Sequence, residues 1–443
     1  MHFQRNIYND LKDWKSKVKR KPLLIMGARQ IGKTTVLKSF GINEYENFIY
    51  LNLEKNQDVH SFFKGNKDPK TILENLGLLY GKKIDTSNSL IVLDEIQENR
   101  DALTALKYFA EEMPEVHIIG AGSLLGLTIG NTSSFPVGKV EFLQMFPLTF
   151  SEYLASKDPN LFQAFHHFLE TPEITPLENA FFNPLKNTFK EYLLFGGMPE
   201  VAADFIENKN IASAQKIQDD ILQAYTLDFV KHAPKSTSTK IQQVWNSIPS
   251  QLAKENKKFI YKLIKSGARA REYEEAIQWL IEAGLVYKVA NVSKANSPLK
   301  AYEDLTAYKI YVFETGLLMR LAGIDPNIYL GAKDLFSTFN GSLAENFVST
   351  SLISAFKKEP YYWTSEGKAE IDFIIEHKEN IIPIEVKSGE QTKAKSLAVY
   401  EKKYSPKIRI RISNLNLKQT DNLINIPLFY AENIKQLIKL RAK

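Results

Sequence analysis

The chain contains no cysteine among its 443 residues. This absence excludes disulfide bonds, zinc sites built on thiolates and catalysis by a cysteine nucleophile, and it agrees with a reducing compartment. Long apolar runs are also missing, since no stretch reaches the roughly 18 consecutive apolar residues that a membrane-spanning helix needs. The basic N-terminal segment has too few consecutive apolar residues for a secretory signal. We therefore expect a cytoplasmic protein that does not contact membranes.

The chain is too long for one hydrophobic core, so we expect two to four domains. Its hydrophobic content of 44% and charged content of 24% are ordinary for a folded protein. The formal net charge is only +6, but residues 387–443 hold 13 Lys or Arg against four Asp or Glu. Such a basic section fits a polyanionic partner, and it fits a solvated lysine-rich surface equally well.

The first third of the sequence alternates buried-strand patterns with helix-length segments. Residues 22–26, 48–54, 89–95 and 116–122 are apolar runs typical of buried strands, and residues 101–113 have the pattern of a helix. This alternation predicts an α/β domain with a parallel sheet over residues 1–155.

A phosphate-binding motif follows the first of these strands. The segment GARQIGKT, from Gly27 to Thr34, matches G-x-x-x-x-G-K-[ST] and opens a helix, which is the context that the motif requires. Glycines let backbone N–H groups surround a phosphate, and the start of a helix favours negative charge. Lys33 would reach the β- and γ-phosphates, and the hydroxyl of Thr34 would bind Mg²⁺. The residues expected to bind ATP here are Gly27, Gly32, Lys33, Thr34 and Thr35.

An acidic pair follows the buried strand in LIVLDEIQE. Asp94 would hold Mg²⁺, usually through water, and Glu95 would polarise the attacking water as general base. Ser123, directly after the strand at 116–122, would contact the γ-phosphate or the water, although a plain turn serine is an equal alternative. Arg29 inside the loop and Arg100 after the acidic pair are either catalytic or structural.

The pattern changes after residue 155. Residues 156–238 are mainly helical, with a long helix over 211–232 and a polar segment at 233–240 that we interpret as a linker. Three short helices followed by a strand, a polar loop and a strand predict a winged-helix domain over 239–328. A last domain is expected over 329–443.

Several motifs together resemble one family. The segments GARQIGKTTVLKSF, LIVLDEIQ, FPVGKVEFLQMFPLTFSEYL and YLLFGGMPEV are similar to those of the bacterial and archaeal AAA-type ATPases that carry the C-terminal domain of unknown function 4143. The resemblance spans nearly the whole chain. It implies a nucleotide-dependent machine or switch in which residues 156–238 form a helical lid, and it supplies no substrate. One departure is the pair Gly138-Lys139, where the family has Gly-Arg, because lysine lacks the bidentate fork of arginine.

The segment AEIDFIIEHKENIIPIEVKSGE predicts a hairpin with strands at 373–375 and 381–386. A turn over 377–380 would place Asp372 opposite Glu385, and Lys387 would share a face with Glu385. Two carboxylates directly opposite each other repel unless a cation lies between them. Pro383 inside the second strand predicts a sheet edge or a bulge.

This arrangement resembles the restriction-endonuclease-like PD-(D/E)xK superfamily, in which an upstream helix adds an acidic residue, here Glu345. The resemblance implies that Glu345, Asp372 and Glu385 bind Mg²⁺ or Mn²⁺. The metal would activate a water, while Lys387 would orient that water and neutralise the transition state. The alternative is a retired nuclease fold that only binds DNA or a protein.

Taken together, these patterns predict an α/β P-loop ATPase that uses ATP and Mg²⁺ and couples nucleotide state to a DNA-directed, nuclease-like C-terminal domain. RNA in place of DNA stays open, as does a homo-oligomer. The rival hypothesis is a nucleotide-gated switch or scaffold whose last domain only recognises a partner. A helicase-like motor is a third hypothesis, which the absence of a second ATPase lobe from the sequence pattern disfavours.

Overall fold

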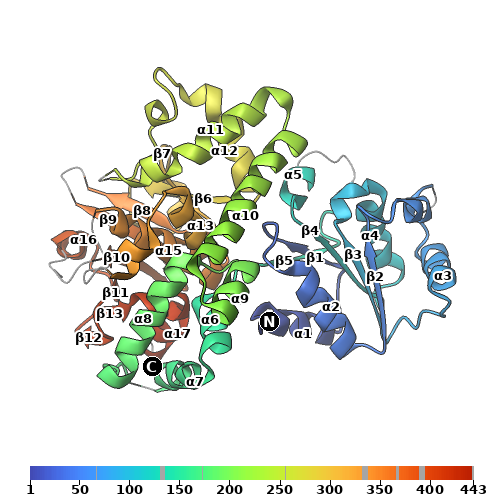
Figure 1. Cartoon of the computed structure of the whole chain (residues 1–443), viewed down its shortest axis with the longest axis horizontal. Coiled ribbons are helices and arrows are strands. Elements are labelled where there is room, and N and C mark those ends of the chain that lie inside the picture. The colour runs from blue at the N-terminus through green and yellow to red at the C-terminus, as the bar shows by residue number, and fades with distance from the viewer. Residues whose placement is uncertain are drawn as a thin grey trace. The chain divides into compact units, whose positions relative to one another are not determined.

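The computed structural model describes residues 1–65, 67–129, 135–171, 173–254, 256–331, 338–365, 369–388 and 395–441 (Figure 1). The chain divides into two compact units. The N-terminal unit comprises Gln4–Pro147 and Glu282–Gly284, and the C-terminal unit comprises Met1–Phe3, Leu148–Ile281 and Leu285–Lys443. The predicted end of the ATPase core at residue 155 lies a short way beyond Pro147, where the main segment of the N-terminal unit ends.

Five parallel strands build the sheet of the N-terminal unit: β1 Leu23–Met26, β2 Asn47–Asn52, β3 Ser89–Asp94, β4 His117–Gly122 and β5 Glu141–Gln144. Their order is β2-β3-β4-β1-β5, which confirms the predicted α/β parallel sheet. Strands β3 and β4 are buried along their whole length, as is usual where helices cover both faces. Because β4 lies between β1 and β3, the loops that follow these three strands are neighbours at one edge of the sheet.

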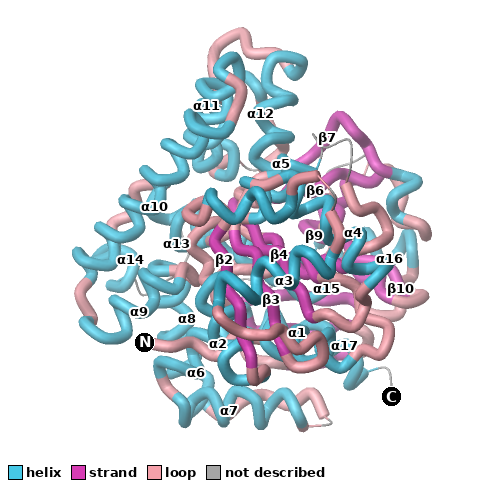
Figure 2. The backbone as a smooth tube through the Cα atoms, turned by 90° about the vertical axis from the view of Figure 1, so that its right-hand side faces the viewer, coloured by secondary structure: helices cyan, strands magenta, loops and turns pink. Residues whose placement is uncertain are grey.

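Helices connect these strands: α1 Ile7–Ser16, α2 Lys33–Glu44, η1 Gln57–Phe63, α3 Pro69–Tyr80, η2 Ile96–Glu98, α4 Arg100–Glu112 and α5 Leu125–Ile129. Helix α2 packs on β2 and β3 (Figure 2). The side chains of Asp68 and Asn99 cap α3 and α4 by accepting hydrogen bonds from amides of the first turn. Gly32, which precedes α2, has no side chain that could cap the amides of the first turn.

The C-terminal unit starts with helices: α6 Phe150–Lys157, α7 Pro159–Glu170, α8 Asn179–Phe195, α9 Pro199–Asn208, α10 Ile211–His232, α11 Lys235–Leu252, η3 Tyr261–Leu263 and α12 Ala270–Glu282. The helix predicted over 211–232 is confirmed as α10. The predicted linker at 233–240 is wrong, because α11 begins at Lys235. The carbonyl of Pro234 accepts the amides of Thr237 and Ser238, and Thr237 is buried. The polar residues of this segment therefore form the first turns of α11.

An eight-stranded mixed sheet follows, formed by β6 Val286–Val292, β7 Glu303–Val312, β8 Tyr361–Thr364, β9 Glu370–His377, β10 Asn380–Lys387, β11 Arg409–Ser413, β12 Lys418–Thr420 and β13 Leu423–Pro427. Its order is β12-β13-β11-β10-β9-β8-β6-β7. Strands β6 and β7 were predicted as the wing of a separate domain at 239–328. Instead β6 runs parallel to β8, with Val292 opposite Trp363. The predicted boundary between residues 328 and 329 therefore runs through one continuous sheet.

The hairpin of β9 and β10 has the predicted register, with Glu376 opposite Ile381 and Phe373 opposite Ile384. The turn is shorter than predicted, because His377 and Asn380 still pair with each other. The prediction that Pro383 marks a sheet edge is wrong, since β10 pairs with β9 on one side and with β11 on the other. The ladder with β11 begins only at Ile384, so the missing N–H of Pro383 lies outside that ladder.

Further helices flank this sheet: η4 Leu299–Tyr302, α13 Thr315–Leu321, α14 Pro326–Gly331, α15 Thr338–Phe356, α16 Lys395–Tyr404, η5 Leu428–Asn433 and α17 Ile434–Arg441. Glu432 connects η5 to α6 by hydrogen bonds. Its carboxylate accepts the amides of Phe150 at 3.0 Å and Ser151 at 2.8 Å. Burial raises the pKa of Glu432 to about 7.

The two glycines of YLLFGGMPEV serve a structural contact at the end of α8. Gly196 has a φ of 80°, and a Cβ on it would lie 2.1 Å from Oε1 of Glu314. The Glu314 carboxylate accepts the amide of Gly197 at 2.8 Å and also caps α13 through the amide of Leu317 at 2.7 Å. The glycine pair thus lets a buried carboxylate join α8 to α13.

Candidate functional site

The predicted phosphate loop connects β1 to α2 in the N-terminal unit. Gly27 has a φ of 155°, and a Cβ there would lie 2.5 Å from the carbonyl oxygen of Met145. Gly32 has a φ of 93°, in the left-handed region that favours glycine. Both glycines of the motif are therefore required by the path of the backbone.

Lys33 is buried and its ammonium group bonds to the loop itself. Nζ donates hydrogen bonds to the carbonyl oxygens of Gly27 and Ala28, each at 2.8 Å. Burial lowers the pKa of Lys33 to about 8, although the negative charges of Glu95 and Asp94 oppose the shift. The loop thus holds a cation that has only neutral hydrogen-bond acceptors, which suits displacement toward an anionic ligand.

Asp94 at the end of β3 accepts two side-chain hydrogen bonds on Oδ2. Thr34 donates from Oγ1 at 2.6 Å, and Tyr50 of β2 donates from its hydroxyl at 2.7 Å. Burial and the neighbouring Asp94 raise the pKa of Tyr50 to about 12, so it stays a donor. Sequence reasoning missed Tyr50, although its place in FIYLNLE puts a polar hydroxyl on a buried strand.

Glu95 has left-handed backbone angles, with φ 50° and ψ 47°, which are uncommon for a residue with a side chain. Its carboxylate accepts a hydrogen bond from Nε2 of Gln97 at 2.6 Å. A Cβ on Gly122 would lie 2.1 Å from Oε1 of Gln97, so the end of β4 leaves room for this side chain. Gln97 was not predicted as a site residue. The sequence signal for it is its position two residues after Glu95.

Ser123 follows β4 and accepts a hydrogen bond from Nε of Arg29 at 3.1 Å. The structure thereby brings Arg29 of the loop together with the predicted γ-phosphate contact. Arg100 and Thr35 are exposed in the first turns of α4 and α2. Lys139, at the departure from the family pattern, forms an ion pair with Glu111 at 3.0 Å.

These side chains come from three loops at the C-terminal edge of one parallel sheet, where α/β folds place their ligands. The oxygens of Thr34 and Asp94 are of the kind that Mg²⁺ prefers, so the residues present fit this ion. Uncapped helix amides, a buried ammonium and a carboxylate beside the metal ligands suit a nucleoside triphosphate.

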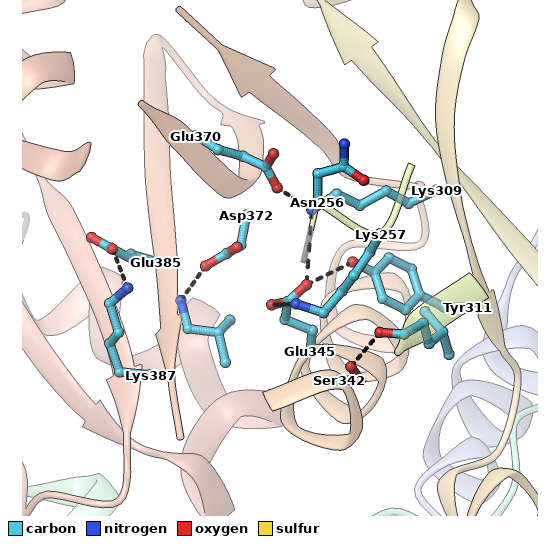
Figure 3. A network of polar contacts seen from close by, with 12 residues as sticks. Asn256, Lys257, Lys309, Tyr311, Ser342, Glu345, Glu370, Asp372, Glu385 and Lys387 are labelled. Atoms are coloured by element: carbon cyan, nitrogen blue, oxygen red, sulfur yellow. Dashed lines mark hydrogen bonds and ion pairs between the residues drawn. The ribbon is translucent and has the colours of Figure 1, made fainter. Parts of the chain in front are cut away.

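The second predicted site lies in the C-terminal unit, where Glu345 of α15 is buried among cations (Figure 3). Its carboxylate lies 2.6 Å from Nζ of Lys257 and 3.8 Å from Nζ of Lys309. The hydroxyl of Tyr311 donates to it at 3.1 Å. Lys309 is fully buried and also pairs with Glu370 at 2.5 Å.

Asp372 of β9 faces this group (Figure 3). Its Oδ2 accepts the amide of Val386 at 2.8 Å. Burial and then the negative charge of Glu345 raise the pKa of Asp372 to about 7, against the opposing charges of Lys309 and Lys257. The carboxylate that raises the pKa of Asp372 is that of Glu345, whereas the predicted hairpin pair was Asp372 and Glu385. The sequence did not predict the lysines that compensate Glu345.

Glu385 and Lys387 of β10 form an ion pair at 2.6 Å. The second oxygen of Glu385, Oε2, is buried and accepts no hydrogen bond from the residues that the structure describes. Among the residues that the structure describes, no group of three or more His, Asp or Glu is arranged to hold a metal ion. The metal-ligand set Glu345, Asp372 and Glu385 thus stays a prediction, as does the role of Lys387.

Three family models match the chain. An AAA domain matches residues 19–154, the domain of unknown function 4143 matches residues 340–429, and a further domain of unknown function, number 8612, matches residues 186–328. These matches support an AAA-type ATPase with a C-terminal domain 4143, in agreement with the resemblance described above. The third match was not foreseen and covers the part of the chain predicted as the end of the lid and the winged helix.

Two curated relatives are similar to this chain over 360 residues at 24% identity: the uncharacterized proteins Mb2031c of Mycobacterium bovis and Rv2008c of Mycobacterium tuberculosis. The match covers 80% of this chain and 67% of each relative.

Matches among solved structures include the Walker-type ATPase PABY2304 of Pyrococcus abyssi, at 15% identity and a TM-score of 0.44 over 72% of this chain and 96% of that one. The Orc1 protein of Aeropyrum pernix, solved in complex with DNA, matches at 15% identity and a TM-score of 0.27, over 72% and 91%. In the described part of the chain, no helix is both long and apolar enough to cross a membrane.

Proposed function

We propose that the protein binds ATP with Mg²⁺ and hydrolyses it at the phosphate loop of its N-terminal unit. The observation that carries this proposal is the contact of Thr34 with Asp94 at 2.6 Å, directly beside Lys33 and Glu95. The match to an AAA domain over residues 19–154 supports it.

Each side chain has a defined part in this hydrolysis. Lys33 exchanges the carbonyls of Gly27 and Ala28 for phosphate oxygens, and Thr34 and Asp94 hold the metal. Bound Mg²⁺ neutralises charge on the phosphates. Glu95, held by Gln97, takes the proton of the attacking water.

Nucleotide binding and phosphate release test this proposal on the wild type, Lys33→Ala and Lys70→Ala. Lys70 is a matched control, because it also lies in the first turn of a helix in the same unit but is exposed. We expect only Lys33→Ala to lose ATP binding. Equal activity of all three proteins would refute the assignment of the site.

We further propose that the C-terminal unit acts on nucleic acid, with DNA as the expected partner, and that the ATPase controls it. The basic excess of residues 387–443 supports a polyanionic partner. Two observations favour a metal-dependent cleavage site. Oε2 of Glu385 is buried without a hydrogen-bond partner among the described residues, and the negative charge of Glu345 acts on Asp372. The ion pairs to Lys257 and Lys309 favour the rival function, a nucleotide-gated switch that binds a partner without cutting it.

DNA cleavage with Mg²⁺ or Mn²⁺, with and without ATP, separates these two functions. Lys387→Ala should abolish cleavage, whereas Lys402→Ala, an exposed lysine on α16, should leave it unchanged. Retained or lost cleavage in Lys33→Ala shows whether ATP controls the nuclease. No cleavage of single-stranded, duplex or branched DNA by the wild type would select the switch.

A further inference from the structure

Arg5, just before α1, bridges two backbone carbonyls that are far apart in the sequence. Its Nη1 donates to the carbonyl oxygen of Ile31 at 2.8 Å, and its Nη2 donates to the carbonyl oxygen of Phe146 at 2.6 Å. Ile31 belongs to the phosphate loop, and Phe146 follows β5. One half-buried guanidinium therefore joins the phosphate loop to the last residues of the N-terminal unit's main segment.

The first of these bonds acts on a phosphate-binding amide. The carbonyl of Ile31 and the amide of Gly32 belong to one planar peptide group and point in opposite directions. Arg5 holds the carbonyl of Ile31 toward its guanidinium group. The amide of Gly32 therefore points away from Arg5. The planar fork of arginine suits this task because both of its bonds have fixed directions.

The second bond lies where the loop already packs closely on the segment after β5. The amide of Met145 donates to the carbonyl of Met26 at 2.8 Å. A Cβ on Gly27 would meet the carbonyl oxygen of Met145. The start of the phosphate loop thus contacts Met145, and its end is linked to Phe146 through Arg5. A rearrangement of the loop therefore acts directly on these two residues.

Leu148, two residues later, is held by the C-terminal unit. Its amide donates to the carbonyl of Gly197 at 2.7 Å, and its carbonyl accepts the hydroxyl of Tyr192 at 2.7 Å. Pro147 is the single residue between a carbonyl fixed by Arg5 and a residue fixed in the other unit.

We propose that Arg5 is a positioning residue that couples nucleotide binding at the phosphate loop to the connection Phe146–Leu148. This inference rests on the proposed ATPase function. When Lys33 leaves the carbonyls of Gly27 and Ala28 for a phosphate, the loop adjusts and moves the carbonyl of Ile31. The guanidinium transmits that movement to Phe146.

Amide hydrogen exchange tests the coupling in the full-length protein with ADP or a non-hydrolysable ATP analogue. In the wild type, nucleotide should slow exchange at least about threefold both in the loop, residues 27–34, and in residues 143–150. In Arg5→Ala the loop should still respond, while residues 143–150 should not. Arg5→Lys should behave like Arg5→Ala, because one ammonium lacks the fork that reaches both carbonyls.

Arg20 provides the matched control. It also donates to backbone carbonyls of the N-terminal unit, those of Lys15, Lys17 and Glu115, and none of these acceptors belongs to the loop or to Phe146. Arg20→Ala should keep the full wild-type response. A response of residues 143–150 that persists in Arg5→Ala would overturn the role of Arg5. A wild-type loop that ignores nucleotide would refute the ATPase proposal instead, and a loop that responds without residues 143–150 would refute the coupling alone.

Discussion

The hydroxyl of Thr34 lies 2.6 Å from Oδ2 of Asp94, so the start of α2 and the end of β3 are in direct contact. Two adjacent ligands of an octahedral Mg²⁺, each at about 2.1 Å, lie about 3 Å apart. Direct or water-mediated coordination therefore requires only a small displacement of these oxygens. The order of the strands brings these two oxygens together, as the proposed metal site requires.

Tyr50→Phe removes the second hydrogen bond to Asp94 and should lower kcat for ATP about tenfold. A hydrogen bond to a charged group contributes about 1.5–3 kcal/mol, and about 1.4 kcal/mol corresponds to a factor of ten. Steady-state ATPase kinetics measure the effect. Tyr80→Phe is the control, since its hydroxyl bonds to the carbonyl of Tyr50 and not to Asp94. Equal rates for the two variants would contradict the role of Tyr50.

Gln97→Ala should lower kcat with little change in KM for ATP, because Gln97 orients Glu95 and has no predicted contact with the nucleotide. The loss should stay smaller than that of Glu95→Gln, which removes the base itself. Kinetics of both single variants and of the double variant measure this. Additive losses in the double variant would show that Gln97 does not act through Glu95.

Lys33→Met should stabilise the nucleotide-free protein at pH 7 by about 1–3 kcal/mol. Since burial lowers the pKa of Lys33 to about 8 from an ordinary 10.5, the charged form is less favourable in the folded state. The penalty is complete below pH 8 and fades as the pH rises toward 10.5. Urea unfolding at pH 7 and pH 10 measures it, with Lys70→Met as the exposed control. A destabilised Lys33→Met protein at pH 7 would contradict the prediction.

Glu432→Gln should flatten the pH dependence of stability between pH 5 and pH 8. The pKa of Glu432 is raised to about 7 in the folded state from an ordinary 4.5, so the folded state retains the proton longer. Stability therefore falls by about 2–3 kcal/mol as the pH rises through this window, and glutamine cannot titrate. Thermal unfolding of the wild type, Glu432→Gln and the exposed-site variant Glu200→Gln measures the difference. Parallel pH profiles for all three would disprove it.

Gly196→Ala should destabilise the C-terminal unit by about 3 kcal/mol or more, because the new Cβ meets the buried carboxylate of Glu314 in a left-handed backbone. Gly323→Ala is the matched control, since Gly323 has a φ of 68° but nothing within 4 Å of its added Cβ. Gly323→Ala should lower the free energy of unfolding by only about 1 kcal/mol. Urea unfolding measures the stability of both variants. Similar losses of unfolding free energy would show that the contact with Glu314 does not cause the destabilisation.

The phosphate loop, the acidic pair and the parallel sheet were predictable because each depends on residues that are close in sequence. Tyr50 was missed because its contact with Asp94 depends on which strand lies beside β3, and a single strand pattern does not specify its neighbours. Gln97 was missed because its hydrogen bond to Glu95 depends on the left-handed turn at Glu95, which the strand pattern did not indicate. The strand patterns themselves were found at nearly the observed positions.

In the C-terminal unit the hairpin register was predictable from the turn and the alternation of side chains. Its surroundings were not. Lys257 precedes its partner Glu345 by 88 residues, and Lys309 precedes Glu370 by 61 residues, so only the fold brings these charges together. The place of β10 inside the sheet likewise depends on β11, which follows after another helix.

The pairing of β6 with β8 has a consequence for dividing the chain experimentally. A fragment that ends at residue 328 would leave β6 with an unpaired backbone edge, and a fragment that begins at 329 would leave β8 in the same condition. Such exposed edges recruit strands from other molecules. When they are expressed separately, the fragment that ends at 328 and the fragment that begins at 329 should aggregate or bind to each other. Residues 148–443 should instead fold as one cooperative unit.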